Sequence, residues 1–215
     1  MNRLHGFHGS CHVLMVDGSY KKVKNIRKGD LVMTFNRKPA RVIGIMITRF
    51  PEGNTDLVKI GHLLITPYQP VLFDNHWMFP KDVVKPETYN CTEVCSFVIE
   101  SNHIVLINNV PCVCLGHNMT GPVVGHPFFG TDCILRDLEQ FSSWGQHGLV
   151  EINSDNFSCN PKTNLVDGII PIPIPTNITT QTMSNLKITR IREIPEATQE
   201  DSFSDITHRN VIGII

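Results

Sequence analysis

The chain has 215 residues, of which 41% are hydrophobic and 18% are charged, and it contains seven cysteines. This composition suffices for the core of one domain with appendages, or of two small domains at most. The formal net charge of −1 gives no electrostatic reason to expect nucleic acid or a membrane as a partner. No stretch has the apolar length of a membrane-spanning helix or of a signal peptide.

The cysteines are odd in number and irregularly spaced. Free thiols in a reducing compartment are therefore expected rather than a disulfide framework. Together with the missing secretion signal, this predicts a cytoplasmic protein.

Short apolar runs separated by turns dominate the chain up to residue 115. Asp17-Gly18 is a hairpin signal. The predicted strands cover residues 12–16, 22–26, 31–35, 40–47, 57–66 (one or two strands), 77–80, 94–100, 104–107 and 112–115. The strands over 94–100 and 104–107 are expected to form a hairpin. Many short strands without helical periodicity indicate an all-β sandwich or barrel-like fold.

The character of the sequence changes after residue 118. Residues 123–130 are rich in aromatic rings, and residues 132–141 place Ile134, Leu138 and Phe141 on one face of a predicted helix. A turn is expected over 144–148 and a strand over 149–152. Residues 171–215 are rich in Pro, Thr and Asn and read as a linker and tail.

Three blocks in this order and at this spacing resemble the Hint superfamily, the fold shared by inteins and hedgehog autoprocessing domains. The opening block is Cys11 with Asp17-Gly18 and residues 26–32, the middle block is Ile65 to Val71, and the closing block runs from Val94 to His117-Asn118. Further motifs, from Thr66-Pro67-Tyr68 to His126-Pro127-Phe128-Phe129-Gly130, resemble the Hint variant of proteins that also carry a von Willebrand factor A domain.

The resemblance implies an all-β Hint fold, horseshoe-like with a pseudo-two-fold axis and a short mixed extension. The expected division is a flank over 1–10, the Hint β domain over 11–118, an extension packed on it over 119–170, and the tail over 171–215. The substrate would be the flanking polypeptide of the chain itself, and a von Willebrand factor A domain is a possible partner in a larger parent protein. Neither a cofactor nor a metal ion is expected.

Hint chemistry begins with an N-to-S acyl shift, in which the Cys11 thiolate would attack the carbonyl carbon of Ser10 and form a thioester. In the family, a Thr and a His three residues later bind the scissile amide and protonate the departing nitrogen. Thr66 is present, but position 69 is Gln69, which cannot deliver a proton. Loss of a general acid costs about two to four orders of magnitude in rate, so slow or absent cleavage is expected.

At the other end, Asn118 would cyclise to a succinimide and break the Asn118–Met119 bond, with His117 as proton donor. Ligation would need Cys, Ser or Thr at the next position, so Met119 makes splicing unexpected. The family pattern also continues past Asn118, which suggests that this residue is incidental.

Several alternatives remain open at this point. Cys11, Thr66 and His117 could be ordinary core residues. Residues His5, His8, Cys11 and His12 with Cys112-x-Cys114 suggest zinc, but they lack zinc-finger spacing and core packing is favoured. The leading hypothesis is self-cleavage at Ser10–Cys11, with thioester hydrolysis or transfer. Its rivals are a degenerate Hint domain kept as a binding or scaffold module, and a Cys/His hydrolase acting on other molecules.

Overall fold

The computed structural model describes residues 3–170, so the predicted linker and tail over 171–215 lie outside the described residues. Strands dominate these residues, and most of them pair antiparallel, which confirms the predicted all-β Hint fold. None of the helices in this part of the chain is long and apolar enough to cross a membrane.

The larger sheet has eight strands in the order β10-β6-β7-β1-β11-β5-β14, with β4 on the other part of the long strand β5. Its strands are β1 (Phe7–His8), β4 (Leu31–Met33), β5 (Pro39–Arg49), β6 (Asn54–Ile60), β7 (Leu63–Ile65), β10 (Glu87–Asn90), β11 (Glu93–Ile99) and β14 (Leu149–Asn153). Strand β14 is the exception in direction, because it runs parallel to β5.

The second sheet has six strands in the order β3-β2-β12-β13-β8-β9. They are β2 (His12–Leu14), β3 (Tyr20–Lys22), β8 (Val71–Phe73), β9 (His76–Met78), β12 (Ile104–Ile107) and β13 (Val110–Val113). Strands β15 (Phe157–Cys159) and β16 (Val166–Ile169) form a separate antiparallel pair. The helices are α1 (Pro80–Val83), α2 (Asp132–Glu139) and α3 (Ser142–His147), with single 3-10 turns at Val23–Asn25 and Ser154–Asn156.

Strand β11 separates two hydrophobic cores. Its residues Cys95, Phe97 and Ile99 belong to the first core, which lies between the two sheets, whereas Val94 and Val98 belong to the second. A strand buried on both faces has a nearly continuous apolar sequence. The predicted hairpin between residues 94–100 and 104–107 is wrong for this reason, because β11 pairs with β5 and β1 while β12 pairs with β2 and β13.

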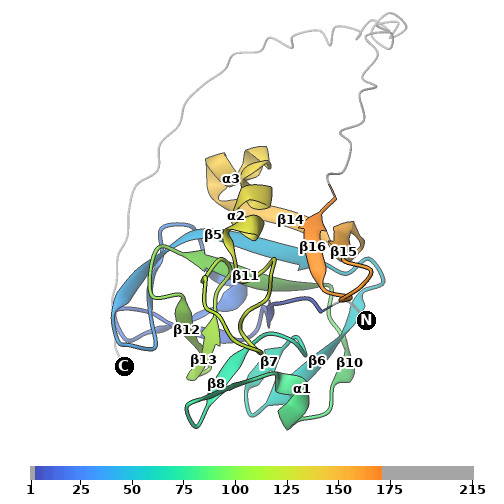
Figure 1. Ribbon diagram of the computed structural model, residues 1–215. Coiled ribbons are helices and arrows are strands. Elements are labelled where there is room, and N and C mark those ends of the chain that lie inside the picture. The colour runs from blue at the N-terminus through green and yellow to red at the C-terminus, as the bar shows by residue number, and fades with distance from the viewer. Residues whose placement is uncertain (1–2, 171–215) are drawn as a thin grey trace, which may run out of the picture. The chain divides into compact units, whose positions relative to one another are not determined.

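Half of the buried residues of the second core follow Asn118. Phe128, Phe129 and Val150 are buried there together with Ile134 and Leu138 of α2. The helix predicted over residues 132–141 is confirmed as α2, and the strand predicted over 149–152 is confirmed as β14. Figure 1 shows α2 and α3 on the same side of the molecule as β14 and β5.

Two local predictions are wrong. Residues 22–26 form the end of β3 and a 3-10 turn rather than a strand. Residues 144–148, expected as a turn, belong mostly to α3. Trp144 of this helix lies over β5 at Gly44, where a Cβ atom would come within 2.0 Å of the indole ring. The absence of a side chain on Gly44 therefore gives the indole its place, and this packing holds α3 against the sheet.

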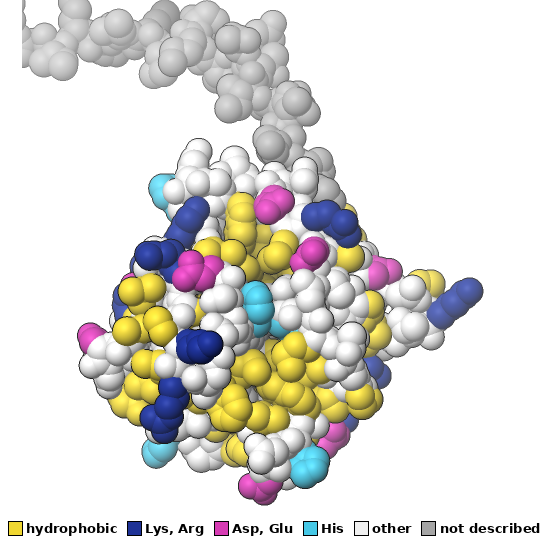
Figure 2. All heavy atoms as spheres, turned by 60° about the vertical axis from the view of Figure 1, so that its left-hand side comes forward, with side chains coloured by type: hydrophobic (Ala, Val, Ile, Leu, Met, Phe, Trp, Pro, Cys, Tyr) yellow, Lys and Arg dark blue, Asp and Glu magenta, His cyan; other side chains and the backbone are white. Residues whose placement is uncertain are grey.

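Figure 2 shows one face of the molecule, where hydrophobic side chains gather and Lys, Arg, Asp and Glu side chains are scattered among them. Charges of both signs therefore alternate on this face.

Candidate functional site

Cys11 precedes β2 and lies in the first core with 1% of its surface exposed. Its thiol donates to the carbonyl oxygen of Leu64 at 3.3 Å and accepts from the Leu64 N–H at 3.2 Å. Burial raises the pKa of the Cys11 thiol, and hydrogen bonds from the backbone of Leu64 and His8 oppose this rise only in part. The thiol is therefore protonated at neutral pH, and both of its hydrogen bonds are to strand β7.

The Ser10–Cys11 peptide lies at the end of a tight turn. Its N–H donates to the carbonyl oxygen of His8 at 3.0 Å, and the exposed Ser10 hydroxyl lies 2.7 Å from Nδ1 of the His8 ring. Among the hydrogen bonds of residues 3–170, none joins this peptide to Thr66, Gln69 or His117.

Thr66 follows β7 and contacts the N-terminal segment at a different peptide. Its N–H donates to the carbonyl oxygen of Gly6 at 3.0 Å, next to the pairing of Phe7 with Ile65. Thr66 is 2% exposed, and its hydroxyl is buried without a hydrogen-bond partner among the described residues. Thr66 thus bonds the Gly6–Phe7 peptide, which adjoins the His5–Gly6 peptide through Gly6.

The His5–Gly6 peptide is held firmly in place. The Ser96 hydroxyl donates to the carbonyl oxygen of His5 at 3.0 Å. Gly6 leaves no room for a side chain as the structure stands, because a Cβ atom there would lie 2.5 Å from Cγ2 of Val94. A polar, buried peptide bond therefore lies beside Thr66, and it carries no nucleophilic side chain.

The His5 ring belongs to a group of three buried imidazoles, together with those of His126 and His117. The His5 ring stacks on Phe129 at 4.6 Å between centroids and meets the His126 ring edge-on at 5.3 Å. Burial, followed by the charges of His126 and His117, holds the pKa of His5 well below its ordinary value. Burial also lowers the pKa of His126 to about 4, with Arg3 and His117 acting in the same direction. These rings are neutral at pH 7.

Gln69 has a structural hydrogen bond. Its side-chain amide donates to the carbonyl oxygen of Val113 at 3.0 Å, and only 2% of the residue is exposed. The bond ties the turn after β7 to strand β13.

His117 and Asn118 are fixed by contacts with the segment that follows them. The Met119 N–H donates to Nδ1 of His117 at 3.0 Å, while Nε2 of the ring is buried without a partner among the described residues. Burial, with a smaller effect of His103, lowers the pKa of His117 to about 4. A neutral ring that accepts the Met119 N–H is not a proton donor to that nitrogen at pH 7.

Asn118 has a left-handed backbone with φ 54°. Its N–H donates to the Gly130 carbonyl oxygen at 2.7 Å, and its side-chain amide donates to Asp132 at 2.9 Å. The residue thereby joins the end of the β domain to the start of α2.

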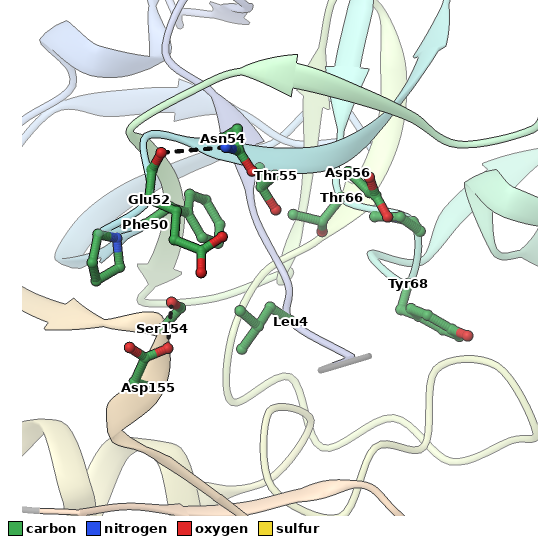
Figure 3. Close-up of a pocket in the computed structure, with 12 residues that line it drawn as sticks. Leu4, Phe50, Glu52, Asn54, Thr55, Asp56, Thr66, Tyr68, Ser154 and Asp155 are labelled. Atoms are coloured by element: carbon green, nitrogen blue, oxygen red, sulfur yellow. Dashed lines mark hydrogen bonds between the residues drawn. The ribbon is translucent and has the colours of Figure 1, made fainter.

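A cleft of about 520 Å³ opens beside Thr66. Its walls come from the segment before β1, the loop between β5 and β6, the start of β6, the turn after β7 and the 3-10 turn at Ser154–Asn156. Figure 3 shows Leu4 and Thr66 lining the same space as the carboxylates of Glu52 and Asp155. Among residues 3–170, no group of three or more His, Cys, Asp or Glu is arranged to hold a metal ion.

The structure therefore divides the predicted site. Cys11 and Ser10 lie apart from the hydrogen bonds of Thr66, and Gln69 and His117 have separate structural partners. Sequence reasoning missed two residues that contact His5, namely Ser96 at its carbonyl oxygen and His126 at its ring. His126 was detectable in the ring-rich motif that it opens, but the contact of Ser96 with His5 joins residues 91 positions apart and has no sequence signal.

Comparisons with known proteins agree with this fold. The family model Vint, described as a Hint-domain, matches residues 5–168. No protein of curated function matches the chain. Solved structures of inteins resemble it at low identity. The gp41-1 intein is 15% identical with a TM-score of 0.39, and the match covers 51% of this chain and 98% of the intein.

Two further solved structures are similar in the same way. The Ssp DnaB mini-intein variant M86 is 11% identical with a TM-score of 0.43, over 53% of this chain and 97% of the intein. A DnaB intein from Synechocystis sp. PCC 6803 is 11% identical with a TM-score of 0.39, over 52% of this chain and 99% of the intein.

Proposed function

Because the chain belongs to the Vint family of Hint domains, a fold of self-processing proteins, we propose that it is a Hint domain that has lost self-cleavage and serves as a binding module. The alternative is the N-to-S acyl shift at Ser10–Cys11. The two candidate functions differ at Cys11: the acyl shift requires its thiol to react, whereas a binding module does not.

The environment of Cys11 carries the proposal. An acyl shift needs a thiolate that is free to reach the carbonyl carbon of Ser10. The Cys11 thiol has a raised pKa, is 1% exposed and is bonded on both sides to the backbone of Leu64. Cleavage at Ser10–Cys11 would first have to break these contacts and ionise a buried group.

The position of Thr66 supports the same conclusion. In Hint proteins this Thr binds the amide that is cleaved, and here its contact in the N-terminal segment is Gly6. By that criterion the ancestral cleavage point lies at Gly6, and neither Gly6 nor the following Phe7 has a nucleophilic side chain. The proton donor expected three residues after Thr66 is replaced by Gln69, which is bonded to Val113.

The contacts of Asn118 also favour a domain that is not cleaved. Asn118 is bonded to Gly130 and Asp132, and Phe128 and Phe129 beyond it are buried in the second core. Cleavage after Asn118 would break the chain inside a packed structure. The module could belong to a larger protein with a von Willebrand factor A domain, which remains part of the proposal.

A fusion protein tests the proposal. A folded reporter protein is joined before Met1 and the fusion is incubated for days with and without dithiothreitol, together with a Cys11→Ala fusion. The expected result is the same intact mass in all samples. Release of the reporter with residues 1–10, abolished by Cys11→Ala, would contradict the proposal and restore the acyl shift as the function.

A further inference from the structure

The cleft beside Thr66 has an acidic lining. Glu52, Asp56 and Asp155 lie on three different segments, the loop before β6, strand β6 itself and the 3-10 turn after β14. Among residues 3–170, no Lys or Arg forms an ion pair with any of the three. Their hydrogen bonds to side chains are with the hydroxyls of Thr88 and Ser154. Three carboxylates thus line one space, and no cation of residues 3–170 pairs with them.

Thr66 supplies an independent sign of a ligand. Its hydroxyl is buried without a hydrogen-bond partner in the described part of the chain, the residue is only 2% exposed, and Thr66 lines the cleft. A buried hydroxyl without a hydrogen bond costs about 1–3 kcal/mol, and such groups are rare in folded proteins. In Figure 3 the Thr66 side chain faces the same space as Leu4 and Glu52. A group that enters the cleft could satisfy it.

Apolar surfaces complete the cleft. Leu4, Phe50 and Pro51 lie along it, and Tyr68 closes one end. Arg3 and Lys81 lie over the Tyr68 ring at 5.1 and 5.3 Å from its centroid, so this end is the positive one. Lys81 is itself paired with Asp82. The negative charge is therefore concentrated at the end formed by Glu52 and Asp155.

We propose that this cleft binds an extended peptide segment of a partner protein through a Lys or Arg side chain. The carboxylates of Glu52 and Asp155 receive the cation, and Asp56 adds negative charge beside Thr66 (Figure 3). Thr66 bonds the peptide backbone, and the apolar wall covers the aliphatic stem. A volume of about 520 Å³ is within the usual range for a site of a few residues or a small ligand. A peptide is favoured over a small cation because the wall at Leu4 is apolar and the unpartnered group is a neutral hydroxyl.

The inference rests on the proposed role as a binding module and is tested separately from it. Fluorescein-labelled eight-residue peptides with two Lys, two Arg or two Glu in an otherwise identical Gly/Ala sequence are titrated with the full chain, and anisotropy is recorded at low and moderate salt. The Lys and Arg peptides should bind, more weakly at the higher salt, and the Glu peptide should not.

Matched variants locate the binding. The triple variant Glu52→Gln, Asp56→Asn, Asp155→Asn should weaken binding at least about tenfold. The control triple Asp74→Asn, Glu139→Gln, Asp167→Asn removes the same charge from positions outside the cleft lining and should leave affinity nearly unchanged. Thr66→Val should weaken binding while leaving the thermal stability of the free protein equal or higher, because it removes an unpartnered hydroxyl.

Three results would overturn the inference. They are equal binding of Lys and Glu peptides, equal losses in both triple variants, and binding of free cadaverine as tight as that of the Lys peptide. Absence of peptide binding in a chain that stays uncleaved in the fusion assay refutes the cleft inference alone. Cleavage at Ser10–Cys11 refutes the proposed function whatever the peptides do.

Discussion

The surroundings of Cys11 and those of the His5–Gly6 peptide each contain only some of the groups that a self-cleavage site needs. Around Cys11 there is a reactive atom in a satisfied, apolar setting, with both hydrogen bonds of the thiol made to Leu64. Around the His5–Gly6 peptide there are a buried imidazole cluster, an adjoining cleft and polar groups that have no partner among residues 3–170, and neither residue of this peptide has a nucleophilic side chain. A cysteine can therefore be identified as the nucleophile only if residues such as Thr66 contact the peptide bond that it would attack.

The largest effect, the gain of self-cleavage, is expected when a thiol is introduced at Gly6, next to Thr66. A Cβ atom at position 6 would lie 2.5 Å from Cγ2 and 2.9 Å from Cβ of Val94, so only Gly at position 94 makes room for it. Gly6→Cys with Val94→Gly should therefore make the reporter fusion cleavable by dithiothreitol between residues 5 and 6. Adding Gln69→His should raise the rate by about 10²–10⁴-fold, as a general acid does. Intact-mass spectrometry over time measures both.

Control variants distinguish cleavage by the introduced thiol from cleavage caused by a disturbed fold. Val94→Gly alone and Gly6→Ala with Val94→Gly should remain intact, and cleavage in the Gly6→Cys variant should survive Cys11→Ala. If a folded triple variant stays uncleaved, Thr66 does not mark the ancestral cleavage point.

Acid should destabilise the imidazole region first. His117 and His126 have folded-state pKa values of about 4, and that of His5 is also lowered, against an ordinary value of 6.5. The unfolded chain therefore binds more protons between pH 6.5 and 4. The contribution of these histidines to the free energy of unfolding is complete above pH 6.5. It falls toward pH 4 by up to about 1.4 kcal/mol per pH unit for each histidine.

Urea unfolding at a series of pH values measures this slope. A His126→Gln variant should show a shallower slope over the same window, whatever its stability at pH 7. A stability that is flat from pH 7 to pH 4 would contradict the burial of neutral imidazoles.

The fold was largely predictable, because short apolar runs and turns in sequence determine strands and because the family blocks are local motifs. The cleft could not be predicted, since its walls come from segments as distant as Leu4 and Asp155. Cys11 and Thr66 were each recognised by residue type, but which peptide Thr66 contacts depends on the pairing of β1 with β7. The predicted strand over 94–100 is confirmed as β11, but its pairing partner was predicted wrongly, because burial on both faces removes the alternation that indicates a partner.

A smaller effect is expected at Cys11 itself. Cys11→Ala should lower the free energy of unfolding by about 1–2 kcal/mol, because it empties part of the core and leaves the Leu64 groups unpaired. Cys133→Ala, at a far more accessible thiol, should change it by less than about 0.5 kcal/mol. Equal effects of the two substitutions would argue against a structural role for Cys11.

The smallest effect is expected at Asn118. Its φ of 54° suits Asn or Gly and disfavours Ala. Asn118→Ala should cost about 1 kcal/mol more in unfolding free energy than Asn118→Gly, although both remove the side-chain amide. If the two variants are equally stable, the backbone conformation is not what Asn118 provides.

The central claim, that Cys11 is a core residue and no longer a nucleophile, is tested most directly by the rate of alkylation of each cysteine. The native chain is treated with iodoacetamide at neutral pH, and each cysteine is followed by peptide mass spectrometry. Cys133 should react fast, because hydrogen bonds from Thr131 and Arg136 lower its pKa and it is partly exposed. Cys11 should react at least about tenfold more slowly and become equally reactive only in denaturant. Modification of Cys11 in the native chain as fast as that of Cys133 would contradict the account.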